Sequence, residues 1–506
     1  MLMVKSRART RPEVALPRLT LIAALLLPLT ASGLAQAQTV RIQPTLDTSL
    51  TWTDNVDTTD TDEQQDWILE VSPGVSISRE SGRFSGALDM RLRNQIYAEQ
   101  TEDNTTFLAL QGRGTIEAVE DAFFVDLGAS VSRDNRSAFR GRFAGDTLDS
   151  DEDNETRLFY VGPRFGFRFG ESGLGNIGYQ ERWLSGGDNA LGDRRTSTWN
   201  ASVADPVALR LFGWGLDYQR TDTRYDEGDT RDLMQEIGRG TLFINLDPQF
   251  RVRAIAGYES NDYSTVQGES GAIWGAGFDW SPTERTSISA TGEDRIFGTG
   301  YDVGVQHRMA RSVWSFSATR DITSSLDELG ETLLLTPQNI LDLEELLVTD
   351  PDAVDDYLAG LTPLFIRTNR YYVSKAVRAA VTLIGVRNTL TVGVAQTDRS
   401  QLDTLGFSGL VDDEFDTYDR VKTREAFVAF DHKLSGLATL RLALQRSKSQ
   451  GYGEDEDETT RTAYTVGVTR NLGPRTSASL TYRHTRSEGT DAYTENTIVA
   501  AVGMRF

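Results

Sequence analysis

The sequence has no cysteine and only three histidines among its 506 residues. The absence of cysteine excludes disulfide bonds, thiolate metal sites and cysteine nucleophiles, and three histidines leave little for a histidine-based metal cluster. Only 39% of the residues are hydrophobic, below the average of about 45–50% for globular proteins. After the N-terminal region no segment approaches the roughly 18 apolar residues of a membrane-spanning helix, so a helical membrane protein is disfavoured. The formal net charge of -22 disfavours a nucleic-acid-binding protein.

The first 37 residues have the layout of an export signal. Basic residues dominate 1–18, an apolar run occupies 19–29, and Ala35-Gln36-Ala37 forms a small-residue cleavage site. This order is typical of a secretory signal peptide, and the apolar run is shorter than the roughly 20 residues that a spanning helix needs. An uncleaved anchor is the alternative. We expect Sec-type export, cleavage near Ala37, and a mature domain over 38–506.

The mature chain alternates polar and apolar residues with a period of two. Phe159, Val161 and Phe165 share one face of a segment whose other face carries Gly162 and Arg164. Similar segments of about ten residues recur along the chain, and a period of two predicts β-strands. A soluble β-sandwich would alternate in the same way, so the alternation alone leaves the class of β-protein open.

Three further features favour a membrane barrel. Short turns alternate with mostly longer polar connections, which is the pattern of bacterial outer-membrane barrels. The longer connections are 54–65, 134–155, 186–194, 222–231, 261–269, 321–369, 398–421 and 448–459. The polar face carries Arg and Asp without interrupting the alternation, as a water-filled lumen allows. The chain ends in Phe506 after Met504 and Val502, which resembles the signal read by the outer-membrane barrel assembly machinery.

The alternating segments give about 22 strand candidates, with 18 or 20 as the alternatives, and a tilted spanning strand uses roughly 9–11 residues. The predicted fold is therefore an all-β, transmembrane, antiparallel up-and-down β-barrel in the cell outer membrane. An even number of strands places both ends of the mature chain in the periplasm.

Several short segments, in their order and spacing, resemble one family. They are W-T-D-N-V (52–56), E-V-S-P-G-V (70–75), V-E-D-A-F-F-V-D (119–126), W-S-P-T-E-R-T-S (280–287), R-I-F-G-T-G-Y (295–301), W-S-F-S-A-T-R-D (314–321) and R-N-T-L-T (387–391). The chain resembles the outer-membrane β-barrel family associated with the exosortase/PEP-CTERM system, within the wider group of β-barrel porins. The resemblance covers nearly all of the mature chain. It implies a barrel that accompanies exopolysaccharide production and surface-protein sorting, and it implies no catalytic residues and no particular substrate.

Strand parity places a set of charges on the polar, lumen-facing side. They are Arg91, Arg93, Arg164, Arg168, Arg251, Arg253, Arg441, Arg483 and Arg505, together with Asp89, Asp126, Asp217 and Asp279, and Glu425 is expected on the same face. Arginine stays charged and pairs with carboxylates through two parallel hydrogen bonds. The charges either select an anionic solute or polysaccharide, or they form ion pairs that brace a wide barrel. We favour the bracing role for most of them.

Acidic runs in the connections offer one weak candidate for a calcium site. Asp149, Asp151 and Asp153 match the start of an EF-hand loop, whose carboxylate oxygens suit Ca²⁺. The match fails at Asn154 and Tyr160, where the motif requires glycine and glutamate. We prefer a solvated acidic surface that shares divalent ions with lipopolysaccharide, and we expect no metal site and no cofactor.

The segment 321–369 differs from every other connection. Thr336-Pro337 and Asp350-Pro351 both have the form of a helix start, and apolar residues follow each of them at helical spacing. A helical pair with apolar faces needs something to cover those faces. We predict that this helical insertion folds into the lumen as a partial plug or packs over the rim. A surface loop with frayed helices is the alternative.

Neither enzymatic catalysis nor TonB-dependent transport fits the sequence well. No G-x-S-x-G motif occurs, and Ser477 and Ser479 lie on the opposite strand face from His484. TonB-dependent transporters share the 22-strand count. Their plug would precede the first strand, which here is expected within a few residues of the cleavage site. We therefore predict that the protein is not an enzyme.

The leading functional prediction is a porin-like conduit that serves exopolysaccharide export or envelope biogenesis. The alternative is a non-conducting structural or docking barrel in an exopolysaccharide or surface-protein sorting system. The expected partners are outer-membrane lipid, lipopolysaccharide, the barrel assembly machinery and polysaccharide, with no nucleic acid.

Overall fold

A computed structural model describes residues 40–79, 82–133, 138–139, 155–185, 193–225, 232–262, 269–325, 327–328, 364, 366, 368, 370–402, 413–453 and 456–506. The chain divides into the units 1–39 and 40–506, and all of the described residues belong to the second. Among the described residues, no helix is long and apolar enough to cross a membrane.

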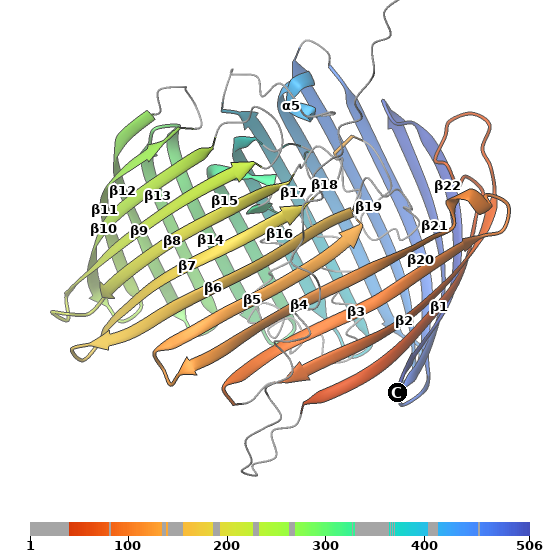
Figure 1. Ribbon diagram of the computed structural model, residues 1–506, viewed down its shortest axis with the longest axis horizontal. Helices are drawn as coiled ribbons and strands as arrows, with labels where there is room; N and C mark the ends of the chain where they lie inside the picture. Colours follow the sequence, from red (N-terminus) through yellow and green to blue (C-terminus); the bar gives the residue numbers. More distant parts are fainter. Residues whose placement is uncertain are drawn as a thin grey trace, which may run out of the picture. The chain divides into compact units, whose positions relative to one another are not determined.

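Twenty-two antiparallel strands form one sheet (Figure 1). The strands are β1 (Arg41–Thr53), β2 (Asp66–Arg79), β3 (Phe84–Tyr97), β4 (Thr105–Val119), β5 (Phe123–Arg133), β6 (Glu155–Phe169), β7 (Gly173–Ser185), β8 (Arg194–Asp205), β9 (Phe212–Tyr225), β10 (Leu233–Asp247), β11 (Phe250–Asn261), β12 (Glu269–Thr283), β13 (Thr286–Arg295), β14 (Gly298–Met309), β15 (Ser312–Ser324), β16 (Tyr371–Ile384), β17 (Asn388–Gln401), β18 (Tyr418–Lys433), β19 (Ala438–Gly453), β20 (Glu458–Gly473), β21 (Thr476–Gly489) and β22 (Tyr493–Arg505). The helical elements within the described residues include the 3-10 turn η2 (Thr101–Asp103) and the helix α5 (Glu414–Thr417).

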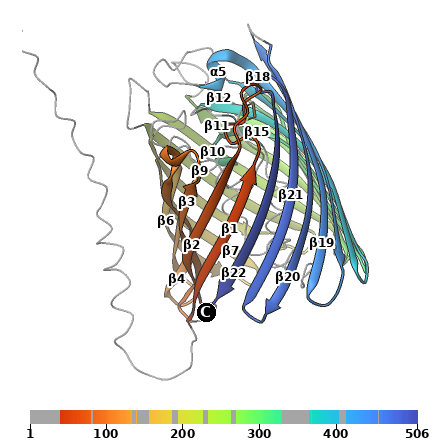
Figure 2. The same cartoon turned by 90° about the vertical axis from the view of Figure 1, so that its right-hand side faces the viewer.

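The sheet is closed into a barrel by its first and last strands. Each strand pairs with the next along the chain, and β1 also pairs with β22, with Thr45 opposite Arg505 and Thr53 opposite Thr497. Figure 2 shows β1 beside β22. The predicted all-β, antiparallel up-and-down barrel with 22 strands is therefore confirmed.

The outer face of the barrel is apolar over most of its height. Exposed side chains on this face include Leu444 on β19, Val466 on β20, Leu480 on β21 and Trp274 on β12, which is 65% exposed. An exposed apolar surface of this extent is a liability in water, whereas lipid-facing residues of a transmembrane barrel are apolar and alternate with polar lumen residues. The outer face is therefore the membrane-facing side.

Several strands extend further than the sequence analysis predicts. The residue pattern predicts connections over 398–421 and 448–459, but β17 continues to Gln401, β18 begins at Tyr418 and β19 continues to Gly453. β18 and β19 have 16 residues each, more than the roughly 9–11 that cross the hydrocarbon layer. The predicted boundaries are wrong because the outward residues of these strand ends are polar, which removes the apolar half of the pattern. Likewise β15 continues to Ser324, so the connection predicted from residue 321 begins later.

The C-terminal residues close the last strand against its neighbours. Met504 lies opposite Thr476 of β21 and Leu46 of β1. Val502 shares its outward face, and the Phe506 amide donates to the carbonyl oxygen of Pro44 at 2.9 Å. The apolar end predicted as an assembly signal thus lies at the junction of the first and last strands.

Buried polar contacts hold the junction of β1 and β22 at the end with the long connections. The side-chain Nδ2 of Asn55 donates to the carbonyl oxygens of Thr59 at 2.7 Å and Thr494 at 3.0 Å. The Thr59 backbone amide donates in turn to Asn55 Oδ1 at 3.0 Å. The Thr53 hydroxyl donates to Glu495 Oε1 at 2.8 Å. Asn55 itself is fully buried, so its side-chain amide depends on these protein partners.

We predict that Asn55→Ala lowers the free energy of unfolding by about 1–3 kcal/mol, because it removes three hydrogen bonds made by a fully buried side chain. Urea unfolding followed by heat-modifiable gel mobility measures the change. Ser49→Ala is the matched control, since Ser49 lies on β1 without a side-chain hydrogen bond to a described residue. Equal unfolding midpoints for the two variants would contradict the prediction.

Candidate functional site

The barrel lumen is the candidate functional site. The strand registers place every charge predicted to face the lumen on the inner side of the barrel. The positions are fixed by the pairing of Arg91, Arg93 and Asp89 on β3, Asp126 on β5, Arg164 and Arg168 on β6, Asp217 on β9, Arg251 and Arg253 on β11, Asp279 on β12, Glu425 on β18, Arg441 on β19, Arg483 on β21 and Arg505 on β22.

Many of these arginines are held in ion pairs along the inner wall. The pairs are Arg91 with Asp47 at 3.7 Å and with Asp89 at 3.8 Å, Arg93 with Glu70 at 2.6 Å, Arg164 with Asp126 at 2.7 Å, Arg253 with Asp279 at 3.2 Å and Arg441 with Asp431 at 2.8 Å. Arg251 instead donates to Asn245 Oδ1 at 2.7 Å, and Arg168 has no ion pair with a described residue. Most of the paired arginines thus brace neighbouring strands.

A second network, which was not among the sequence predictions, lies on the inner wall of β10–β15. Arg295 is 6% exposed and pairs with Glu259 at 2.6 Å and Asp321 at 3.2 Å. Glu293 pairs with Arg239 at 3.0 Å. The period-two parity of β11 and β13 could have identified these residues, because they alternate with outward-facing side chains.

Residues of the long connection between β15 and β16 lie against the inner wall of β17 and β18. Arg399 of β17 is fully buried. Its guanidinium pairs with Glu328 at 2.8 Å and donates to the carbonyl oxygen of Leu364 at 2.9 Å. The Leu364 amide donates to Glu425 Oε1 at 3.4 Å. These described residues of the connection are therefore anchored inside the barrel, while 329–363 of the predicted helical insertion lie outside the described residues.

An apolar cluster joins three separate connections inside the barrel. Its members are Ala138, Phe139, Leu364, Ile366, Tyr372, Phe415, Tyr418 and Val421. The Phe139 and Tyr418 rings lie 4.7 Å apart. Inner-face residues on the neighbouring strands are buried as well, including Thr423 on β18, Ser449 on β19 and Arg461 on β20. This side of the lumen is filled at the end with the long connections.

Asp413 positions α5 at the edge of this cluster. Its carboxylate accepts the Phe415 backbone amide at 2.9 Å, which caps the helix, and it pairs with Arg370 at 3.2 Å. The Thr368 hydroxyl donates to the same carboxylate at 3.1 Å. Burial raises the pKa of the Asp413 carboxyl, and the charge of Arg370 opposes that change.

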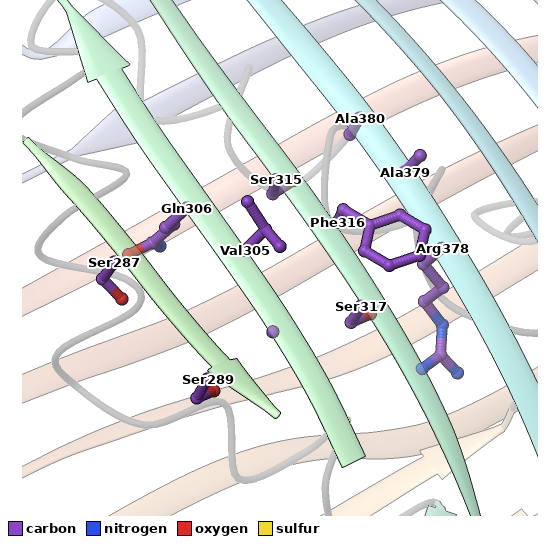
Figure 3. A pocket seen from close by; sticks show the side chains of 11 residues that line it. Ser287, Ser289, Val305, Gln306, Ser315, Phe316, Ser317, Arg378, Ala379 and Ala380 are labelled. Atoms are coloured by element: carbon purple, nitrogen blue, oxygen red, sulfur yellow. The ribbon is translucent and has the colours of Figure 1, made fainter. Parts of the chain in front are cut away.

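The inner wall of β13–β16 is open by contrast. A hollow of about 360 Å³ lies there, with polar side chains around it (Figure 3). Its polar lining consists of Ser287, Ser289, Gln306, Ser315, Ser317 and Arg378. None of these side chains has a hydrogen bond or ion pair with another described residue. Their donors and acceptors are therefore available to water or to a solute.

Two further groups from the sequence analysis remain to be placed. Asp149, Asp151 and Asp153 lie outside the described residues. His484 Nδ1 lies 2.8 Å from Asn496 Oδ1, and both residues belong to the outer face.

No family model matches the sequence, and no curated protein matches it. Among solved structures, the chain is similar to the siderophore receptor PirA of Acinetobacter baumannii, at 8% identity, with a TM-score of 0.49 and coverage of 93% of this chain and 81% of that one. It is similar to the FrpB iron transporter of Neisseria meningitidis at 9% identity and a TM-score of 0.47, covering 92% and 81%. It is also similar to OccK5 (OpdH) of Pseudomonas aeruginosa, at 10% identity and a TM-score of 0.34, with coverage of 92% of this chain and 98% of that one.

We predict that Arg399 anchors the connection inside the lumen, and the cysteine-free chain allows a direct test. Ser325 is fully buried and donates to the Ile366 carbonyl oxygen at 3.0 Å, so a Ser325→Cys reporter is expected to resist maleimide. Adding Arg399→Met removes the hydrogen bonds that hold Glu328 and Leu364. If these bonds stabilise the closed position of the connection by about 1–3 kcal/mol, labelling of Ser325→Cys becomes about tenfold faster or more.

The control reporter is Ser315→Cys, because Ser315 is exposed on the open wall. It is expected to react at the same rate with and without Arg399→Met. Protection of Ser325→Cys that survives the loss of Arg399 would contradict the anchoring role.

Proposed function

We propose that the protein is a porin-like conduit for hydrophilic, anionic solutes across the outer membrane. The observation that supports this proposal best is the hollow on the inner wall of β13–β16, where hydroxyl, amide and guanidinium groups face the lumen without protein partners. Buried or structural polar groups are normally paired within the protein. Groups left unpaired on an open wall are arranged for contact with water and with what water carries.

Unpaired guanidinium groups give the conduit its expected selectivity. Arg378 in the hollow and Arg168 on β6 have no ion pair with a described residue, whereas arginines such as Arg164 and Arg441 are neutralised by carboxylates. Fixed positive charges that line a pore favour anions. Serine hydroxyls and the Gln306 amide can both donate and accept hydrogen bonds, as hydroxyl-rich solutes require.

The finer part of the proposal is a role in exopolysaccharide export or envelope biogenesis. Its support is the sequence resemblance to the exosortase/PEP-CTERM-associated barrels. A polysaccharide with acidic groups would match the hydroxyl-rich wall and the unpaired arginines.

The second candidate is a non-conducting docking barrel. The cluster around Phe139, Leu364 and Phe415 supports this alternative, because it fills one side of the lumen. In that case the connections would act as a platform for envelope partners.

Planar-bilayer recordings of the refolded protein test the conduit. We predict steady conductance with anion preference, and Arg378→Glu with Arg168→Glu shifts selectivity several-fold towards cations because it reverses two unpaired lumen charges. Arg220→Gln is the control, since Arg220 is on the outer face, and it leaves selectivity unchanged. A variant lacking 329–363 is recorded in parallel. Silence of both the intact and the shortened protein, with folding shown by gel mobility, would contradict the conduit and favour the docking barrel.

A further inference from the structure

Six cations gather on the outer face of β16, β18 and β19, at the end where the long connections lie. This basic patch consists of Lys375, Arg420, Lys422, Arg424, Arg446 and Lys448. Across β18 and β19, Arg424 lies directly opposite Lys448. Arg446 is the outward residue that precedes Lys448 on β19, and it lies opposite Ala426. Lys375 and Lys422 are both opposite Asp398 of β17. The patch therefore has cations on β16, β18 and β19, with Asp398 of β17 between those of β16 and β18.

The basic patch begins where the apolar surface ends. Towards the long connections, the outward residues Leu442 and Leu444 of β19 are followed by Arg446 and Lys448. In the same direction on the antiparallel strand β18, Val428 and Ala426 are followed by Arg424, Lys422 and Arg420. Leu442, Leu444 and Val428 are exposed to the lipid side. A change from apolar to cationic side chains at one level is expected where the hydrocarbon meets the lipid headgroups, because Lys and Arg stems extend along apolar surface with their charges in the polar layer.

The patch carries a local excess of positive charge in a chain whose formal charge is -22. Two carboxylates lie among the six cations on this face. Arg420 Nε donates to Asp398 Oδ1 at 2.6 Å, and Lys448 forms an ion pair with Glu458 at 2.5 Å. Lys375, Lys422 and Arg446 have no ion pair with a described residue. Three of the four lysines that follow the signal peptide lie in this patch, so it does not reflect the general composition.

Outward-facing arginines on the other side of the barrel are neutralised, which makes the patch distinct. Arg220 pairs with Asp222 at 3.0 Å and Arg224 with Asp232 at 3.6 Å. In the patch, Arg420 and Lys448 also have carboxylate partners, but Lys375, Lys422 and Arg446 have no ion pair with a described residue. Arg424 also lies directly opposite Lys448, and since like charges opposite one another are destabilising, a bound anion would offset the excess positive charge.

We propose that the basic patch binds the phosphate groups of an anionic lipid in the outer leaflet of the outer membrane. Long connections of such barrels are extracellular, which puts the patch in the outer leaflet. The membrane-facing position favours a lipid over a soluble ligand, because acyl chains can lie on the exposed Leu442 and Leu444 while phosphates reach the cations above them. Lysine and arginine bind phosphate through charge and hydrogen bonds.

The test titrates the refolded full chain in detergent with bis-phosphorylated lipid A and follows the temperature at which heat-modifiable gel mobility is lost. Lipid A is expected to raise this temperature for the wild type. Lys422→Gln with Arg424→Gln is expected to weaken the apparent affinity about 30-fold, from a contribution of about 1 kcal/mol per cation near an anionic lipid surface. Lys422→Arg keeps the charge and is expected to keep the affinity.

The matched control is Arg220→Gln with Arg224→Gln, which removes two outward cations on β9 that are already paired. It is expected to bind lipid A like the wild type. Wild-type affinity in the Lys422/Arg424 variant, or an equal loss in the two double variants, would overturn the proposal. Inorganic phosphate at the same phosphate concentration is expected to have no effect, and stabilisation equal to that by lipid A would make this a site for free phosphate and not for lipid.

Discussion

A backbone inside hydrocarbon cannot leave its N–H and C=O groups unpaired, and the pairing of β1 with β22 satisfies this requirement for the whole sheet. The other features of the molecule depend on that closure. A closed sheet has one face towards lipid and one towards the lumen, so a period of two in the sequence becomes an apolar exterior and a polar interior. The same alternation that makes the barrel compatible with a membrane therefore also equips its lumen with charge.

The parts of the structure that depend on this alternation could be predicted from the sequence. The strand number follows from it, and so does the inner position of residues such as Arg91, Arg164 and Arg441. Strand ends beyond the hydrocarbon layer, such as those of β18 and β19, could not be placed, because both faces are polar there. The burial of Arg399 and the meeting of Phe139, Leu364 and Phe415 were also out of reach. They depend on contacts between connections far apart in the chain, for which no local pattern exists.

The two walls of the lumen differ in what covers them. The β13–β16 wall keeps polar groups open to solvent, whereas the inner face of β17–β20 is covered by anchored connections. The basic patch lies on the outside of this covered wall. The proposed lipid therefore binds the outer face of strands whose inner face contacts the connections. A bound lipid would stiffen the wall against which the connections pack. The packing of the connections and the binding of lipid would then depend on opposite faces of the same strands.

The hydrogen bond between Thr53 and Glu495 joins residues 442 positions apart. Every other strand pairing joins neighbours in the chain and can form from local hairpins at a small entropic cost. The final pairing has the highest contact order in the molecule, and contacts of that kind form slowly. Until it forms, both edges of a sheet of 22 strands are open to aggregation. The chain therefore has to be complete, and its edges protected, before the last step of folding can take place.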